Sequence, residues 1–198
     1  MKRMVISALL TLVLVVVSLN LLDLPLASWV AGYLRVYGLN QENVQVPDLL
    51  LLSVAIISGL CWAAYFLFVR RHIHDRHSEF VLVTGTVLPL SFALKAFLKW
   101  VFGRTETRAW LSERGAVGFH WFAGTEGLSG FPSGHMLVYT PLLLSLWHFY
   151  PRYRRYYELA WAGLCVALIA TQYHFLSDII AGAYIGALVL LGTRRAYR

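Results

Sequence analysis

The sequence predicts an all-α membrane protein: a six-transmembrane helix bundle with a short amphipathic surface helix between the first and second spans. Its 198 residues are 59% hydrophobic and only 14% charged, whereas soluble domains are about half apolar and about a quarter charged. Six apolar windows approach the roughly 20 residues that a bilayer-spanning helix needs. They cover residues 4–22, 49–69, 80–101, 135–150, 156–173 and 178–192. No repeat or low-complexity tract separates them, so we expect one integral-membrane domain over residues 1–198.

The distribution of basic residues predicts the topology. The net charge is +7, and most of the Lys and Arg residues lie at the two termini and in every second loop. These clusters are Lys2 and Arg3; Arg70, Arg71 and Arg76; Arg152, Arg154 and Arg155; Arg194, Arg195 and Arg198. Six spans with both termini on one side place all four clusters in the cytoplasm, as the positive-inside rule requires. We therefore expect a multi-pass protein of the inner (plasma) membrane with cytoplasmic termini, and no nucleic-acid partner.

The first span and the segment after it lead to two expectations. The apolar core of residues 4–22 is too long for a cleaved signal peptide, and no small-x-small site follows closely.

Residues 23–48 contain apolar side chains at helical spacing. These are Leu26, Trp29, Val30, Tyr33, Leu34 and Tyr37. We predict a short amphipathic helix on the outer membrane surface, with its aromatic rings at headgroup level; an ordered loop packed on the bundle is the alternative.

The loop after the second span raises the question of a metal site. It contains three histidines and one aspartate, His72, His74, Asp75 and His77. Imidazole and carboxylate groups bind zinc, but the flanking arginines repel a dication. We therefore expect a solvated basic turn and no metal. Cys61 and Cys165 lie inside apolar spans, where a free thiol behaves as a small hydrophobe.

Positive side chains gather at the outer end of the third span. Lys95 and Lys99 lie one turn apart, and Arg104 follows the predicted helix end. We expect Lys95 to extend to the outer surface. Lys99 and Arg104, a point charge and a forked guanidinium, suit phosphoryl oxygens. The long loop that follows adds Arg108 and His120 as secondary site candidates.

Residues 130–136 place a hydroxyl, an N–H donor and an imidazole at the start of an apolar helix. Pro132 and Ser133 are typical of a helix N-terminus, whose free N–H groups and dipole favour an anion. His135 exchanges protons near neutral pH. A bound phosphate would meet the Ser133 hydroxyl, the Gly134 N–H and His135 together. The alternative is that Ser133 only caps the helix and His135 is an interfacial histidine.

A second polar pair opens the last span. His174 and Asp178 are spaced i,i+4, so on a helix they face the same way. A carboxylate hydrogen-bonded to one ring nitrogen leaves the other nitrogen nucleophilic. Gly182 and Gly186 continue the stripe and allow close approach to a neighbouring helix. A structural polar pair is the alternative.

Together, these motifs resemble the type 2 phosphatidic acid phosphatase (PAP2) superfamily, which shares its site with the vanadium haloperoxidases. The resemblance covers about residues 95–190. It rests on Pro-Ser-Gly-His at 132–135, on His-x-x-x-Asp at 174–178, and on Lys99 with Arg104.

The resemblance implies a metal-independent lipid phosphate phosphatase without a cofactor, which acts at the outer face on a phosphomonoester or diphosphate. His174, oriented by Asp178, would attack phosphorus and form a phosphohistidine. His135 would protonate the leaving group and then activate water. Four groups would neutralise the phosphoryl oxygens: Lys99, Arg104, Ser133 and the Gly134 N–H. The expected partners are a lipid phosphate and the bilayer, and homo-oligomerisation is left open.

The chain departs from the family pattern at two arginine positions, which are occupied by Glu106 and Leu168, and Arg108 is a candidate substitute. These departures keep a non-catalytic lipid-binding relative as an alternative. A rhomboid-like intramembrane serine protease with Ser133 and His174 is another. Against the protease, the serine lies in Gly-x-x-Ser-Gly, and the remaining polar motif residues would have no role.

Overall fold

The structure, a computed structural model, describes residues 2–37, 49–73, 75–113, 115–123 and 127–197. Within these ranges the regular secondary structure is helical, and the only pairing of strand type is an isolated bridge between Arg104 and Phe119. The helices are α1 (Lys2–Val17), the π-helix η1 (Ser18–Leu22), α2 (Asp23–Val36), α3 (Leu50–Arg70), α4 (Arg76–Phe102), α5 (Thr107–Glu113), α6 (Gly134–Phe149), the 3-10 helix η2 (Pro151–Tyr153), α7 (Arg154–Ala170) and α8 (Leu176–Ala196). The predicted all-α class is confirmed.

Four helical segments of the described chain are long and apolar enough to cross a membrane. They are Met4–Val36, Leu50–Arg70, Arg76–Phe102 and Leu176–Ala196. The windows predicted for the fourth and fifth spans are helical as well, but α6 and α7 have only 16 and 17 residues. A bundle of six spans therefore stays a prediction.

The helices α4, α6 and α8 form the centre of the bundle. Buried aliphatic side chains join them to α3, namely Leu50, Val54, Val83, Val87, Leu88, Val138 and Leu190. A Cβ on Gly182 would lie 2.5 Å from the Ser133 carbonyl oxygen, and one on Gly186 would lie 2.7 Å from that of Leu137. The predicted close approach of the glycine face is thus confirmed, and it brings the start of α8 against the start of α6.

The outer helices carry many exposed apolar side chains. On α1, for example, Leu9, Leu10 and Leu12 are each more than half exposed. Such surfaces are typical of helices that face lipid, because hydrocarbon chains solvate leucine as well as a protein core does.

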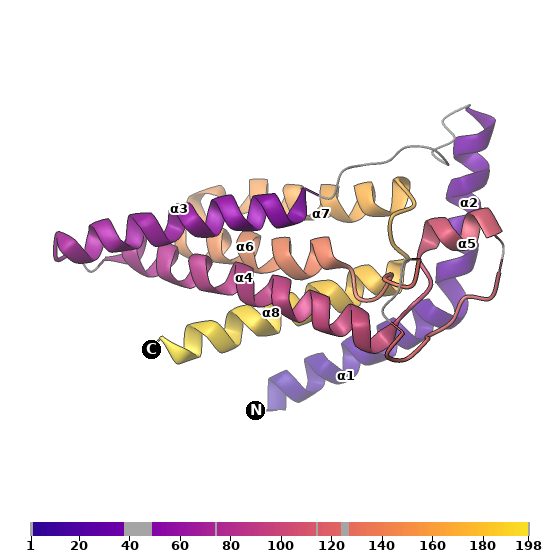
Figure 1. Ribbon diagram of the computed structural model, residues 1–198, viewed down its shortest axis with the longest axis horizontal. Helices are drawn as coiled ribbons and strands as arrows, with labels where there is room; N and C mark the ends of the chain where they lie inside the picture. The colour runs from indigo at the N-terminus through magenta and orange to yellow at the C-terminus, as the bar shows by residue number, and fades with distance from the viewer. Residues whose placement is uncertain (1, 38–48, 74, 114, 124–126, 198) are drawn as a thin grey trace.

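The first span and the predicted surface helix form one helical run. A π turn, Ser18–Leu22, joins α1 to α2, and α2 then runs across the end of the bundle (Figure 1). The helix predicted from aromatic spacing is present up to Val36, whereas residues 38–48 lie outside the described residues. Trp29, Tyr33 and Tyr37 are exposed and contact one another in sequence, with ring centroids 6.1 and 4.7 Å apart.

The two ends of the bundle differ in their polar residues: one end has the cap of α4, and the other has the sequence motifs. The connection between α3 and α4 lies at one end, toward which the C-terminal helix α8 runs, and α2 and α5 lie at the other end (Figure 1). At the former end, Asp75 accepts hydrogen bonds from the N–H groups of His77 and Ser78 and so caps α4. His74, which belongs to the predicted basic turn, lies outside the described residues. The sequence motifs expected to form a site all map to the end that carries α2 and α5.

Candidate active site

The long loop after α4 begins at Gly103, the C-cap of that helix. Gly103 has a left-handed backbone with φ of 51°. A Cβ there would lie 2.0 Å from the His120 carbonyl oxygen, so the loop can cross back over the helix end only at a glycine. The next residue is Arg104. Its long side chain does not reach the surface and is only 1% exposed.

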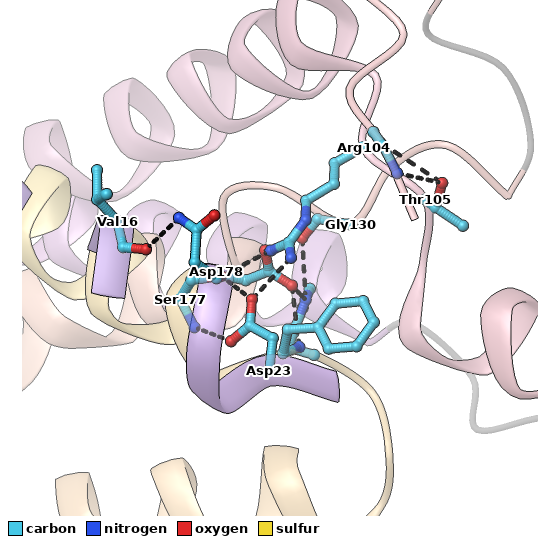
Figure 2. A network of polar contacts seen from close by, with 11 residues as sticks. Val16, Asp23, Arg104, Thr105, Gly130, Ser177 and Asp178 are labelled. Atoms are coloured by element: carbon cyan, nitrogen blue, oxygen red, sulfur yellow. Dashed lines mark hydrogen bonds and ion pairs between the residues drawn. The ribbon is translucent and has the colours of Figure 1, made fainter. Parts of the chain in front are cut away.

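Arg104 lies between two carboxylates. Its Nη2 donates to Asp23 Oδ2 at 2.7 Å, and its Nη1 donates to Asp178 Oδ1 and, at 2.7 Å, to Ser177 Oγ (Figure 2). We expected this guanidinium to meet phosphoryl oxygens. Instead, both of its terminal nitrogens are engaged by protein groups, and Phe175 lies 4.7 Å from it. We call Asp23, Arg104, Ser177 and Asp178 the buried network.

Asp23 belongs to the site, although none of the sequence motifs contains it. It is 2% exposed, and besides Arg104 it accepts a hydrogen bond from the Ser177 N–H at 3.0 Å and another from the Ser177 hydroxyl. The sequence feature that could have indicated its role is a carboxylate at the end of an apolar span. Ionisable groups at membrane depth are rare and are usually paired. By sequence, Asp23 falls at the start of the predicted surface segment.

Asp178 holds the entry to α8 but does not form the expected hydrogen bond to His174. Its Oδ2 accepts from the Phe175 N–H at 2.9 Å, and its Oδ1 accepts from Arg104. The distance from His174 Nδ1 to Oδ2 is 3.7 Å, which is an ion-pair distance and too long for a hydrogen bond. The reason is local: α8 begins at Leu176, so His174 precedes the helix and the i,i+4 rule does not align the two side chains.

His174 is oriented by a backbone carbonyl. Its Nδ1 lies 3.1 Å from the Gly130 carbonyl oxygen. Because a carbonyl can only accept, Nδ1 carries a proton, and in the neutral ring Nε2 has the lone pair. Nε2 is buried and has no hydrogen-bond partner within the described part of the chain. The tautomer that we expected Asp178 to impose is therefore imposed by Gly130.

The two histidines of the motifs lie beside each other. The ring centroids of His135 and His174 are 6.3 Å apart, and Tyr173 contacts both rings. His135 is half-buried at the first turn of α6, whereas His174 is 4% exposed. The pair combines a buried ring, whose Nε2 has no described partner, with a more accessible ring. This arrangement suits a nucleophile and an acid–base group.

Ser133 caps α6, as predicted. Its Oγ accepts from the Met136 N–H at 3.4 Å, and its own N–H donates to the Asp178 carbonyl at 3.0 Å. The side chain is fully buried. This cap therefore ties the start of α6 to the start of α8, and the buried hydroxyl is a poor candidate for a protease nucleophile.

Lys95 lies against the same motif. A Cβ on Gly134 would lie 2.7 Å from Lys95 Cε, so the lysine stem covers this glycine. Its Nζ is 4.8 Å from the Phe92 ring, one turn further from the outer end of α4. Lys95 therefore turns back along α4 and does not extend past the helix end as expected, because Gly134 has no side chain and leaves room for the lysine stem.

The other predicted cations differ in position. Lys99 is half-buried one turn beyond Lys95 on α4. Arg108, on α5, donates through Nη2 to the Thr171 carbonyl at 2.9 Å, and its guanidinium lies 5.1 Å from the Tyr173 ring. Since Tyr173 contacts both histidines, Arg108 is close to the pair. We call the three half-buried cations Lys95, Lys99 and Arg108 the cationic rim.

His120 does not join this group. It is exposed, and both its Nδ1 and its backbone N–H contact the Gly103 carbonyl, at 3.3 and 3.0 Å. Its described contacts therefore hold the long loop to the end of α4, which supports the structural alternative for this secondary candidate.

The two positions at which the sequence departs from the expected motifs have other roles here. Glu106 accepts a hydrogen bond from the Ser129 hydroxyl, and its N–H donates to the Gly127 carbonyl at 2.9 Å. Leu168 is 6% exposed and packs with Met136 and Ile179. Glu106 thus holds the loop and Leu168 fills the core, while the Arg108 guanidinium lies against Tyr173, which contacts both histidines.

Comparison with known proteins gives one match. Residues 80–198 match the family model of the PAP2 superfamily. No curated protein and no solved structure matches the chain. The matched part contains both histidines, Ser133, Asp178 and the cationic rim, but not Asp23.

Proposed function

Because this chain belongs to the PAP2 superfamily, we propose that it is a membrane lipid phosphatase that hydrolyses a phosphomonoester or diphosphate through a phosphohistidine. The observation that supports this most strongly is the histidine pair. Nδ1–H of His174 is held on the Gly130 carbonyl, so that Nε2 has the lone pair, and His135 lies beside it.

The reaction has two steps that use the same two rings. His174 Nε2 attacks phosphorus, the P–O bond to the leaving group breaks, and His135 gives its proton to the departing oxygen. His135, now neutral, takes a proton from water as that water attacks the phosphohistidine. Inorganic phosphate leaves, and both histidines return to their starting states.

In this proposal, charge on the phosphoryl oxygens is neutralised by the cationic rim and by the N-terminus of α6. Lys95 and Lys99 approach from α4, and Arg108 approaches from α5. Preorganised cations and N–H groups stabilise the charge of a transferring phosphoryl group. Arg104, whose terminal nitrogens are engaged by Asp23, Asp178 and Ser177, takes a positioning role instead of phosphate binding.

The substrate we propose is a lipid with its phosphate at the outer headgroup level. Helices α6 and α7 would complete six spans, although their 16 and 17 residues reach about 24 and 26 Å at a rise of about 1.5 Å per residue. A plasma-membrane enzyme with this topology meets phosphatidate-like lipids, phosphatidylglycerophosphate, polyprenyl diphosphates or lipid A phosphates.

Phosphate release by the purified protein tests the proposal. We expect a panel of these lipids to include a substrate, with activity that survives EDTA, is inhibited by vanadate, which mimics the five-coordinate transition state, and disappears in His174→Ala. The absence of His174-dependent release from every lipid would favour a non-catalytic lipid-binding relative. Activity that is lost in EDTA and restored by zinc or magnesium would contradict the mechanism.

Cysteine labelling tests the orientation. Ser112 on α5 and Tyr153 between α6 and α7 are both exposed and lie at opposite ends of the bundle. In a background with Cys61 and Cys165 replaced, an impermeant maleimide should label Ser112→Cys in intact cells, and should label Tyr153→Cys only after the membrane is opened. The reverse pattern would invert the proposed topology.

A further inference from the structure

Asp23, which precedes the part of the chain that matches the family, belongs to the buried network. It follows the π turn between α1 and α2, and such turns are frequent at functional sites. Its carboxylate reaches two segments of the matched region: Arg104, just after α4, and Ser177, in the first turn of α8 (Figure 2). The N-terminal helical run, Met4–Val36, is therefore connected to the site by charge as well as by packing.

The charges of the buried network do not cancel. Counted as ionised, Asp23 and Asp178 carry two negative charges and Arg104 carries one positive charge, so that the network has one net negative charge. All three side chains are at most 2% exposed. Electrostatic interactions at such depth are weakly screened. The ring nitrogen Nδ1 of His174 lies 3.7 Å from Asp178 Oδ2, so a carboxylate of this negatively charged network is adjacent to the ring.

The proposed reaction places a positive charge on that ring. His174 keeps the proton on Nδ1 while Nε2 bonds to phosphorus, so the neutral imidazole becomes a phosphoimidazolium with one positive charge. The charge disappears when water takes the phosphoryl group. A fixed negative charge beside the ring stabilises the transition state in which this charge develops.

We infer that Asp23 is a positioning residue for this reaction: by sharing Arg104, it leaves the charge of Asp178 available to His174. Without Asp23, Arg104 would neutralise Asp178 completely. This inference rests on the proposed function and deepens it by assigning a role to the N-terminal helical run.

A second connection runs through the backbone. The Gly130 N–H donates to the Arg104 carbonyl at 2.8 Å, and the Gly130 carbonyl accepts from His174 Nδ1 at 3.1 Å. Asp23 anchors the Arg104 side chain, so it also steadies the carbonyl that sets the His174 tautomer. Both connections lead from Asp23 to the ring, and neither brings Asp23 into contact with the substrate.

The test compares variants that change the net charge of the network in opposite directions. Asp23→Asn keeps the size of the side chain and gives a net charge of zero, whereas Arg104→Gln gives two negative charges. The double variant restores one negative charge. We expect Asp23→Asn to lower kcat roughly 10–100-fold, with little change in KM, because it removes stabilisation of the transition state alone.

The double variant separates charge from structure. If net charge matters, Asp23→Asn with Arg104→Gln should recover at least about threefold in kcat over Asp23→Asn alone, although it removes more contacts. Asp75→Asn, at the opposite end of the bundle, is the matched control and should leave kcat and KM unchanged. Thermal unfolding in detergent identifies variants that are not folded.

Each outcome bears on one conclusion. A wild-type protein that releases no phosphate through His174 would overturn the proposed function itself. Wild-type activity with an unchanged kcat in Asp23→Asn, or a double variant no better than Asp23→Asn, would overturn only the role of Asp23. If Asp23→Asn does not fold, Asp23→Glu carries the test: a kcat within about threefold of wild type supports the charge role, and a larger loss overturns it.

Discussion

Two sets of charged side chains lie at the same end of the bundle, and they differ in burial and in their partners. Asp23, Arg104 and Asp178 of the buried network are at most 2% exposed and are paired with one another. The cationic rim is half-buried, and its contacts include a lysine stem on Gly134 and a guanidinium beside Tyr173. Charge that is enclosed and held by protein partners orients neighbouring groups, whereas charge at the boundary can meet a ligand.

The largest expected effect is at His174, which lies beside Asp178 of the buried network and contacts Tyr173, the neighbour of Arg108. His174→Ala removes the proposed nucleophile, so we expect phosphate release to fall on the order of 10⁴-fold or more on every substrate, whatever its leaving group. Release is measured on a lipid alkyl phosphate and on an activated aryl phosphate. Recovery of the variant on the aryl substrate would show that His174 is not the nucleophile.

His135 is half-buried, like the cationic rim, and its replacement should have a different effect from that of His174. Its proton is needed only while the leaving oxygen is basic, so His135→Ala should lose about 10²–10⁴-fold on the alkyl phosphate and much less on the aryl phosphate. The same two substrates measure this ratio. An equal defect on both, together with rescue of His174→Ala on the aryl substrate, would require the two roles to be exchanged.

Replacing one arginine from each set sharpens the contrast. Arg104→Leu leaves two buried carboxylates without their shared partner, so we expect a loss of about 3–5 kcal/mol in the free energy of unfolding. Arg108→Leu should leave the stability nearly unchanged and raise KM roughly 10–100-fold, because it removes a charged contact to the substrate. Unfolding in detergent and steady-state kinetics distinguish the two. Similar effects of both variants would remove the distinction between the network and the rim.

The smallest effect is expected at the opposite end, at the cap of α4. Hydrogen bonds from the Ser78 and His77 N–H groups hold the pKa of Asp75 below its usual value. A lowered folded-state pKa means that the cap stabilises the fold at neutral pH and is lost as the pH falls through that value. Asp75→Ala should therefore unfold at a slightly lower temperature at pH 7, with unchanged kinetics. Its melting temperature should converge with that of wild type in acid, and a constant difference would contradict the assignment.

The local features of this protein were predictable from sequence. The helical windows, the cap formed by Ser133 and the glycine face of Gly182 and Gly186 all appear in the structure. These features depend on helical periodicity, on contacts within a few residues, or on a single helix face. The residues close by in the sequence therefore contain the required information. The family followed from motifs of the same local kind.

The partners of the charged groups depended on the packing of distant segments. Arg104 meets Asp23 across 81 positions, and His174 meets the Gly130 carbonyl across 44. Motif spacing suggested Asp178 as the partner of His174 and a phosphate as the partner of Arg104, and it placed Lys95 at the surface. A buried polar group takes whichever donor or acceptor the folded helices bring within about 3 Å, and only the arrangement of α2, α4, α6 and α8 sets that distance.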